Sequence, residues 1–163
     1  MKPWIKAGLI GGILQIVFTL PSFAAFYLPL GIGGLLSTLA CCAFLFLYPL
    51  PGILEAYWSQ DARGEGKIVL GGAMAGLLAT GLDGIVTFLL IWIASASGGF
   101  TDYLQKAMPN EMDLIDQAGM GFMFETPALL IQAVFGLLFH IFSGVVVSAL
   151  AGLVYSGMKN KSK

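Results

Sequence analysis

The longest uncharged stretch of the chain decides its fold. It runs from Ala7 to Leu54 and reads AGLIGGILQIVFTLPSFAAFYLPLGIGGLLSTLACCAFLFLYPLPGIL. A helix of about 20 apolar residues crosses the roughly 30 Å hydrocarbon core of a bilayer, so this stretch is too long for one span and long enough for two. Pro29 and Gly31 interrupt it, and residues of these types mark a turn. We therefore predict two membrane-spanning helices, over residues 4–27 and 31–48.

Two more apolar stretches follow, over residues 68–96 and 127–157, and each is long enough for a further span. Pro49 and Pro51 are expected to end the second span, and a polar loop over residues 55–67 then leads to the third. The acidic connection over residues 97–126 contains enough apolar residues to predict short helices lying at the membrane surface. The sequence thus predicts an all-α integral membrane protein, in which residues 1–163 form one compact bundle of four transmembrane helices.

The composition excludes most other classes of protein. Hydrophobic residues make up 58% of the chain and charged residues 10%, and the mean hydropathy is +0.88. A soluble domain carries about 25% charged residues, so this chain lacks the surface of one. A net charge of −1 leaves no basic excess to bind a nucleic-acid backbone. The expected partners are therefore the lipid bilayer and other membrane subunits or further copies of the chain, without nucleic acid.

The basic residues predict how the chain is oriented. Four spans place both termini and the loop over residues 55–67 on one side of the membrane. That side holds all but one of the basic residues: Lys2, Lys6, Arg63, Lys67, Lys159, Lys161 and Lys163. The opposite side has only Lys106. Because cytoplasmic loops carry the excess of Lys and Arg, we expect both termini in the cytoplasm, in a prokaryotic inner or plasma membrane.

Small residues recur at every fourth position of the predicted spans, which places them along one face of each helix. Such faces allow two helix backbones to approach closely in a membrane. The residues predicted to pack helices in this way are Gly8, Gly12, Gly33, Gly34, Gly72, Gly76, Thr80, Gly84, Gly144, Ser148 and Gly152. The helix they face belongs either to this chain or to a partner.

Two ionisable residues lie inside predicted spans, Asp83 in the third and His140 in the fourth. Counting from the cytoplasmic end at 1.5 Å per residue, their depths differ by roughly 3 Å, so the two side chains are candidates for a pair. A structural hydrogen bond is one use of such a pair. A proton relay is another, because histidine titrates near neutral pH. The third is a single axial histidine ligand to a haem or a chlorophyll-type pigment, and no other cofactor and no metal site is predicted.

No enzyme motif is present: the sequence contains no HExxH, GxSxG or GxxxxGK[ST] pattern. We expect a non-catalytic accessory or assembly subunit of a larger membrane complex, of the electron-transfer or light-harvesting kind. The alternative is a small oligomeric transporter or channel in which Asp83 and His140 form a proton or ion pathway.

Overall fold

The computed structural model describes residues 1–24, 28, 30–59, 65–97, 105–106, 109–121 and 126–161. The elements within them are all helices: α1 (Pro3–Ala24), α2 (Leu30–Leu47), α3 (Leu50–Trp58), α4 (Glu65–Ala96), α6 (Pro109–Gln117) and α7 (Thr126–Lys161). In this described part of the chain, four stretches are long and apolar enough to cross a membrane, namely Pro3–Ala24, Ile32–Trp58, Gly66–Ala96 and Pro127–Lys159. The all-helical class and the number of candidate spans are therefore confirmed.

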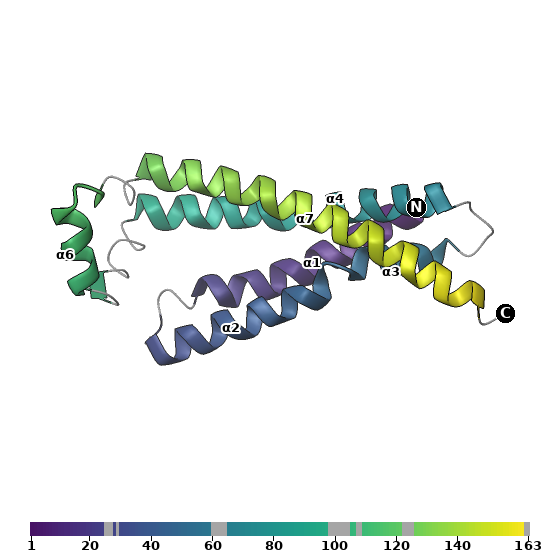
Figure 1. The fold of residues 1–163 in the computed structure, drawn as a ribbon, viewed down its shortest axis with the longest axis horizontal. Helices are drawn as coiled ribbons and strands as arrows, with labels where there is room; N and C mark the ends of the chain where they lie inside the picture. The colour runs from purple at the N-terminus through teal and green to yellow at the C-terminus, as the bar shows by residue number, and fades with distance from the viewer. Residues whose placement is uncertain are drawn as a thin grey trace.

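The long helices run along one axis, and the two ends of the molecule differ (Figure 1). Both chain termini lie at one end, together with the end of α3 and the start of α4; we call this the terminal half. The short helix α6 lies across the opposite end, which we call the distal half. Short surface helices were predicted within residues 97–126. In the described part of that segment, α6 is the one helix longer than two residues.

The second candidate span consists of two helices: the first ends just before Pro49, as predicted, and a second helix that was not predicted follows it directly. α2 ends at Leu47 and α3 begins at Leu50, with Pro49 as its N-cap and Pro51 in its first turn. Proline is tolerated there because the first N–H groups of a helix have no helical partner. The span therefore continues to Trp58. The polar loop begins beyond it rather than at residue 55, and Glu55 is a buried helical residue.

The other boundaries differ by smaller amounts. α4 begins at Glu65 rather than at residue 68, and α7 continues to Lys161 rather than ending at residue 157. α1 ends at Ala24, and residues 25–27 of the predicted first span lie outside the described residues. Polar residues thus extend both α4 and α7 at the terminal end, because a helix can continue beyond its apolar segment while its polar side chains remain in water.

The terminal half is held together by backbones in close contact. α4 packs mainly against α7 and α1, and α3 packs against all three of these helices. A side chain added at Gly8 would lie 2.9 Å from the carbonyl oxygen of Ala75, and one at Gly76 would lie 2.7 Å from that of Gly144. One added at Gly52 would overlap the backbone of Ser148. Only glycine permits these approaches.

Large apolar side chains cover the outside of the bundle. Leu45, Phe46, Phe135 and Phe139 each expose between 68% and 77% of their surface. The fully buried side chains, in contrast, include polar ones such as Gln15 and Thr80. So many exposed large apolar side chains indicate a non-aqueous environment or a partner that covers them.

Candidate functional site: a cavity between the spans

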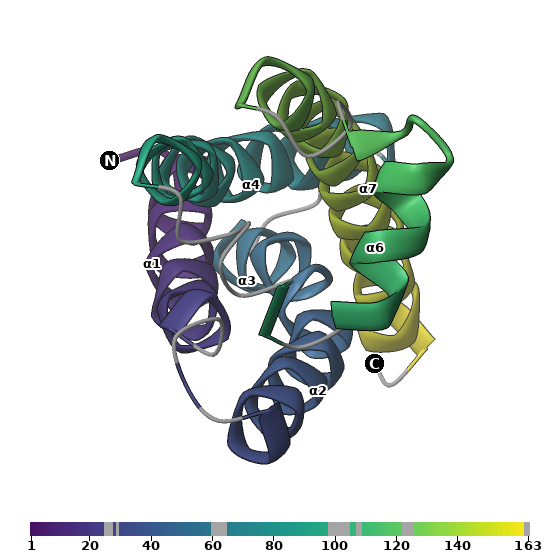
Figure 2. The same ribbon diagram turned by 90° about the vertical axis from the view of Figure 1, so that its left-hand side faces the viewer.

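α1 and α2 diverge from α4 and α7 toward the distal end (Figure 1). A cavity of about 650 Å³ lies between these helices. Its lining residues come from all four of these helices and from Tyr48, between α2 and α3. Along α4 the lining extends from Asp83 to Ser95, a length of about 18 Å at 1.5 Å per residue. Figure 2 looks at the distal end, where the four helices surround the centre. The volume lies within the roughly 300–1,000 Å³ typical of small-molecule sites.

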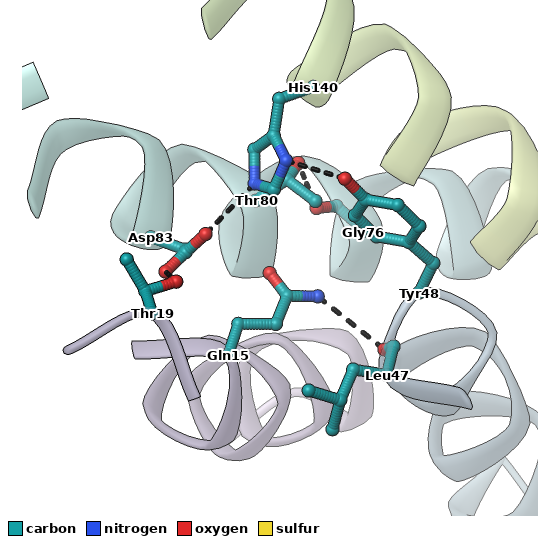
Figure 3. Close-up of polar contacts among 8 residues, drawn as sticks. All are labelled: Gln15, Thr19, Leu47, Tyr48, Gly76, Thr80, Asp83 and His140. Atoms are coloured by element: carbon teal, nitrogen blue, oxygen red, sulfur yellow. Dashed lines mark hydrogen bonds and ion pairs between the residues drawn. The ribbon is translucent and has the colours of Figure 1, made fainter. Parts of the chain in front are cut away.

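A chain of polar side chains forms the end of this cavity nearest the terminal half (Figure 3). The Thr19 hydroxyl donates to Oδ1 of Asp83 at 2.7 Å. Nε2 of His140 lies 3.1 Å from Oδ2 of the same carboxylate, and the Tyr48 hydroxyl lies 2.6 Å from Nδ1 of His140. We call these four residues the polar cluster. It connects α1, α4, α7 and the junction between α2 and α3.

Local sequence features bring the members of the cluster together. Gly84 follows Asp83, and a side chain there would overlap Leu137 and approach the His140 ring, so glycine lets α7 come close at this level. The interruption between α2 and α3 directs the Tyr48 ring at His140, with ring centroids 5.3 Å apart. The Phe44 ring also lies edge-on to the His140 ring, with the two centroids 6.2 Å apart.

Burial makes the carboxylate the centre of the cluster. The side chain of Asp83 is 2% exposed and that of His140 is 18% exposed. An isolated buried carboxylate would be costly, and hydrogen bonds and an opposite charge offset that cost. With Asp83 ionised, the carboxylate only accepts, so Nε2 of a neutral His140 carries the hydrogen and Nδ1 accepts from Tyr48. The Nε2–Oδ2 contact has the distance of an ion pair without the alignment of a linear hydrogen bond.

The remainder of the cavity wall is mostly apolar. Phe23, Phe44, Phe88, Ile91 and Leu129 are among the residues that line it. Among the residues that the structure describes, no Lys or Arg lines the cavity, and Asp83 is the one carboxylate that does. A molecule in this space would therefore meet apolar and aromatic groups along its length and one acidic group at its end.

The structure shows what faces each of the small residues that were predicted to pack helices. Gly72, Gly76 and Thr80 of α4 face Ser148 and Gly144 of α7 in close contact. Other predicted packing residues contact different helices. Gly8 and Gly12 approach α4, Gly84 approaches Leu137 of α7, and Gly152 lies against the carbonyl oxygen of Gly52. Gly33 is buried, whereas an added side chain at Gly34 would meet no other described atom within 4 Å. At Gly34 the described part of this chain therefore supplies no packing contact, and packing there against a partner stays a prediction.

Sequence reasoning brought Asp83 and His140 together but missed Thr19 and Tyr48. Thr19 lies on the face of α1 that carries Gly8, Gly12 and Gln15, and this spacing was an available signal. Tyr48 gave none, because tyrosine beside proline at a span end suits an interface. The hydroxyl of Thr80 donates to the carbonyl of Gly76 rather than to Asp83.

A second buried carboxylate lies in the terminal half. Glu55 of α3 is 1% exposed and accepts a 2.6 Å hydrogen bond from the hydroxyl of Ser59, one turn later. Its carboxylate lies against Gly71 of α4, where a side chain would overlap it. Nearby, the Lys6 ammonium lies 4.4 Å from the ring centroid of Trp58. These contacts tie the polar end of α3 to α1 and α4.

Comparison of the chain with protein-family models, with curated proteins and with solved structures gives no match. The functional interpretation therefore depends on the geometry of the cavity and its polar cluster.

Proposed function

We propose that the chain is an integral membrane transporter that binds a small molecule in the cavity and couples its movement to protons through Asp83 and His140. The observation that carries this proposal is the position of the pair: a buried carboxylate and the one histidine of the chain lie 3.1 Å apart at the end of a cavity lined by four candidate spans. Ionisable residues inside membrane spans are costly to insert and typically serve ion or substrate pathways.

The asymmetry of the bundle supports a transport pathway with one closed side. The cavity lies in the distal half, and close backbone contacts fill the terminal half, so a molecule that entered from the distal end would stop at the polar cluster. The positive-inside prediction puts the termini in the cytoplasm, and the cavity then faces the outside. Transport requires a second state, in which the distal end closes and the terminal half opens.

The polar cluster has the chemistry of a proton acceptor. A proton that reaches the imidazole of His140 is stabilised by the carboxylate 3.1 Å away, and the Tyr48 hydroxyl can rotate to accept a hydrogen bond from Nδ1. The Thr19 hydroxyl keeps the second carboxylate oxygen in place. The pair therefore passes between a form with one net negative charge and a neutral form.

The accessory-subunit function expected from the sequence remains a second proposal with weaker support. It was motivated by faces of small residues that could hold a partner, and those on α4 and α7 are occupied by each other. Ligation of a haem or a chlorophyll-type pigment by His140 is also weakened, because both ring nitrogens lie within 3.1 Å of protein oxygens. Ligation by His140 would require one of these two contacts to change.

Reconstitution tests the transport proposal. Purified chain is placed in liposomes that contain a pH-sensitive dye, and three probes of similar shape are added outside: tetraphenylphosphonium, tetraphenylborate and neutral triphenylphosphine oxide. We expect at least one probe to change the internal pH faster than in protein-free liposomes, and Asp83→Asn to remove the difference. Identical traces from wild type and Asp83→Asn with all three probes contradict the proposal. A stoichiometric membrane partner recovered from native membranes in that case favours the accessory function.

A further inference from the structure

The charge of the cavity indicates what kind of molecule it accepts. Among the residues that the structure describes, four side chains that can ionise line it: Asp83 of α4, His140 of α7, Cys41 of α2 and Tyr48 between α2 and α3. Within the same part of the chain, the Asp83 carboxylate contacts the Thr19 hydroxyl from α1 and the His140 ring, which is neutral when unprotonated. With a neutral histidine the end of the cavity carries one negative charge, in surroundings of low dielectric where that charge acts strongly.

Aromatic rings line the same part of the cavity as this charge. Phe44, Tyr48 and His140 form a group whose ring centroids lie 5.3 to 6.2 Å apart, and Phe88 lines the cavity on α4 beyond Asp83. The faces of phenylalanine and tyrosine rings attract cations within about 6 Å of the centroid, most strongly where water is excluded. The aromatic rings and the carboxylate therefore favour the same sign of charge on a ligand.

The size and polarity of the rest of the cavity favour an organic cation over a bare inorganic one. Ca²⁺ and Mg²⁺ need six or more oxygen ligands at 2.0–2.6 Å. Among the described residues, the oxygens that contact Asp83 or His140 are the hydroxyls of Thr19 and Tyr48, which with the two carboxylate oxygens make four. The hydroxyls elsewhere on the wall, such as those of Thr87 and Ser95, carry no charge. In contrast, the cavity offers about 650 Å³ of mostly apolar space next to the polar cluster. An apolar body attached to the positive charge would fill that space and displace water from it.

We propose that the substrate is a lipophilic organic cation, whose charged centre lies against Asp83 and the Phe44 and Tyr48 rings and whose apolar body occupies the cavity toward Ser95. This inference rests on the transport function proposed above and names its substrate class. Binding of the cation and protonation of the Asp83–His140 pair exclude each other, because either one neutralises the single negative charge. Where the pair is protonated, one proton leaves it for each cation that binds, so the transporter exchanges the two.

Binding to the purified full chain in an uncharged detergent tests this inference. Equilibrium dialysis measures the affinity for tetraphenylphosphonium, tetraphenylborate and triphenylphosphine oxide, which share three phenyl groups or more and differ in charge. We expect the cation to bind at least tenfold more tightly than the neutral probe and the anion not to bind. In weakly buffered solution, at a pH where the pair is protonated, each cation that binds should release close to one proton.

Variants locate the charge that selects the cation. Asp83→Asn should weaken tetraphenylphosphonium binding at least tenfold and remove the proton release, while leaving binding of the neutral probe within twofold. Asp113→Asn removes an exposed carboxylate from α6 and is the charge-matched control; it should leave both measurements unchanged. His140→Gln should keep cation binding and lose the part of its pH dependence that comes from protonation of the imidazole. If Asp83→Asn does not fold, the comparison of the three probes on wild type decides.

The outcomes separate this inference from the transport proposal. Equal or tighter binding of the anion or the neutral probe by wild type overturns the inference, as does an unchanged cation affinity in Asp83→Asn. If one of the other two probes then drives Asp83-dependent proton movement in liposomes, transport stands and the substrate class is wrong. If the cation binds as expected but no probe moves protons, the site stands and transport is wrong.

Discussion

The terminal and distal halves of the bundle are built from the same four spans, yet one is tightly closed and the other contains a cavity. In the terminal half, Gly8, Gly52 and Gly76 bring backbones into contact. In the distal half the facing positions hold bulky side chains such as Phe23, Phe88 and Leu129, and the helices diverge. Packing between membrane helices depends on close approach, so the distribution of small residues decides which half closes.

Glycine alone does not mark the closed half. Gly136 and Gly144 lie two turns apart on α7, but an added side chain would overlap Thr80 at Gly144 and meet no other described atom within 4 Å at Gly136. Gly136 instead lines the cavity. What distinguishes the two halves is whether a small residue on one helix faces a small residue or a backbone on another. The following substitutions test that distinction.

The largest effect is expected from Gly52→Ala. The added methyl group would overlap the carbonyl of Ser148. Neither the backbone at Gly52 nor that at Ser148 can shift without moving its helix. We expect a loss near the upper end of the about 1–3 kcal/mol found for overpacked sites, measured by unfolding in mixed detergent micelles. A stability equal to that of wild type would mean that α3 and α7 are not in contact.

A smaller loss of stability is expected from Gly144→Ala, and Gly136→Ala on the same helix is its control. Gly144→Ala meets the Thr80 side chain, which can shift, so we expect a loss of about 1–2 kcal/mol. Gly136→Ala has open space and replaces a poor helix former, so we expect a gain of about 0.5–1 kcal/mol. Measured in the same unfolding assay, two equal changes would remove the proposed difference between the halves.

Thr19→Val tests the boundary between the halves with an almost unchanged side-chain shape. The substitution removes the hydroxyl that donates to Asp83, and hydrogen bonds to charged groups contribute about 1.5–3 kcal/mol. We expect the lower end of that range, because His140 remains beside the carboxylate. Ser22→Ala is the control, since its exposed hydroxyl bonds to the Phe18 carbonyl of its own helix and should matter little. Equal stabilities of the two variants would contradict the assigned contact.

The smallest effect is expected from Tyr48→Phe, which keeps the ring and removes its hydroxyl. The hydroxyl makes one hydrogen bond to Nδ1 of His140, and a neutral bond of this kind contributes about 0.5–1.5 kcal/mol. The nuclear magnetic resonance signals of His140 should shift in the same variant and are easy to assign, because the chain contains one histidine. Unchanged imidazole signals would show that the Tyr48 hydroxyl does not contact the ring.

The sequence allowed the number of candidate spans and the similar depth of Asp83 and His140 to be predicted. Both follow from regular helix geometry, since apolar length sets the spans and the rise per residue sets the depth of each side chain. Thr19 and Tyr48 could not be predicted as partners, because a hydrogen bond depends on the rotation of one helix about its axis relative to another. The sequence contains no direct measure of that rotation.

The cavity and the continuation of the second span were unpredictable for different reasons. Whether two helices diverge depends on the side chains they direct at each other across the bundle, and Gly34 illustrates the difficulty, because its spacing matches that of packed glycines while it lies in open space. Pro49 and Pro51 are usually read as an end to a helix. At the N-terminus of α3 they begin one, and Glu55 is buried as a result.

The two native cysteines offer the most direct test of the central proposal, that molecules from outside reach Asp83 through the cavity of the distal half. Cys41 and Cys42 are adjacent on α2 at the same depth and both are exposed on the surface of the chain, but only Cys41 is among the residues that line the cavity. The measurement compares Cys42→Ala, which retains Cys41, with Cys41→Ala, which retains Cys42. Each variant, in intact cells, is treated with a small charged thiol reagent that does not cross membranes.

Because a water-soluble reagent reaches the cavity but not the lipid, we predict that Cys41 reacts from outside and that Cys42 stays unmodified. In inverted vesicles, where the reagent meets the closed terminal half, neither cysteine should react. Prior binding of tetraphenylphosphonium should slow the reaction of Cys41. Equal reaction of the two cysteines from outside, or no reaction of Cys41 from that side, would contradict the account.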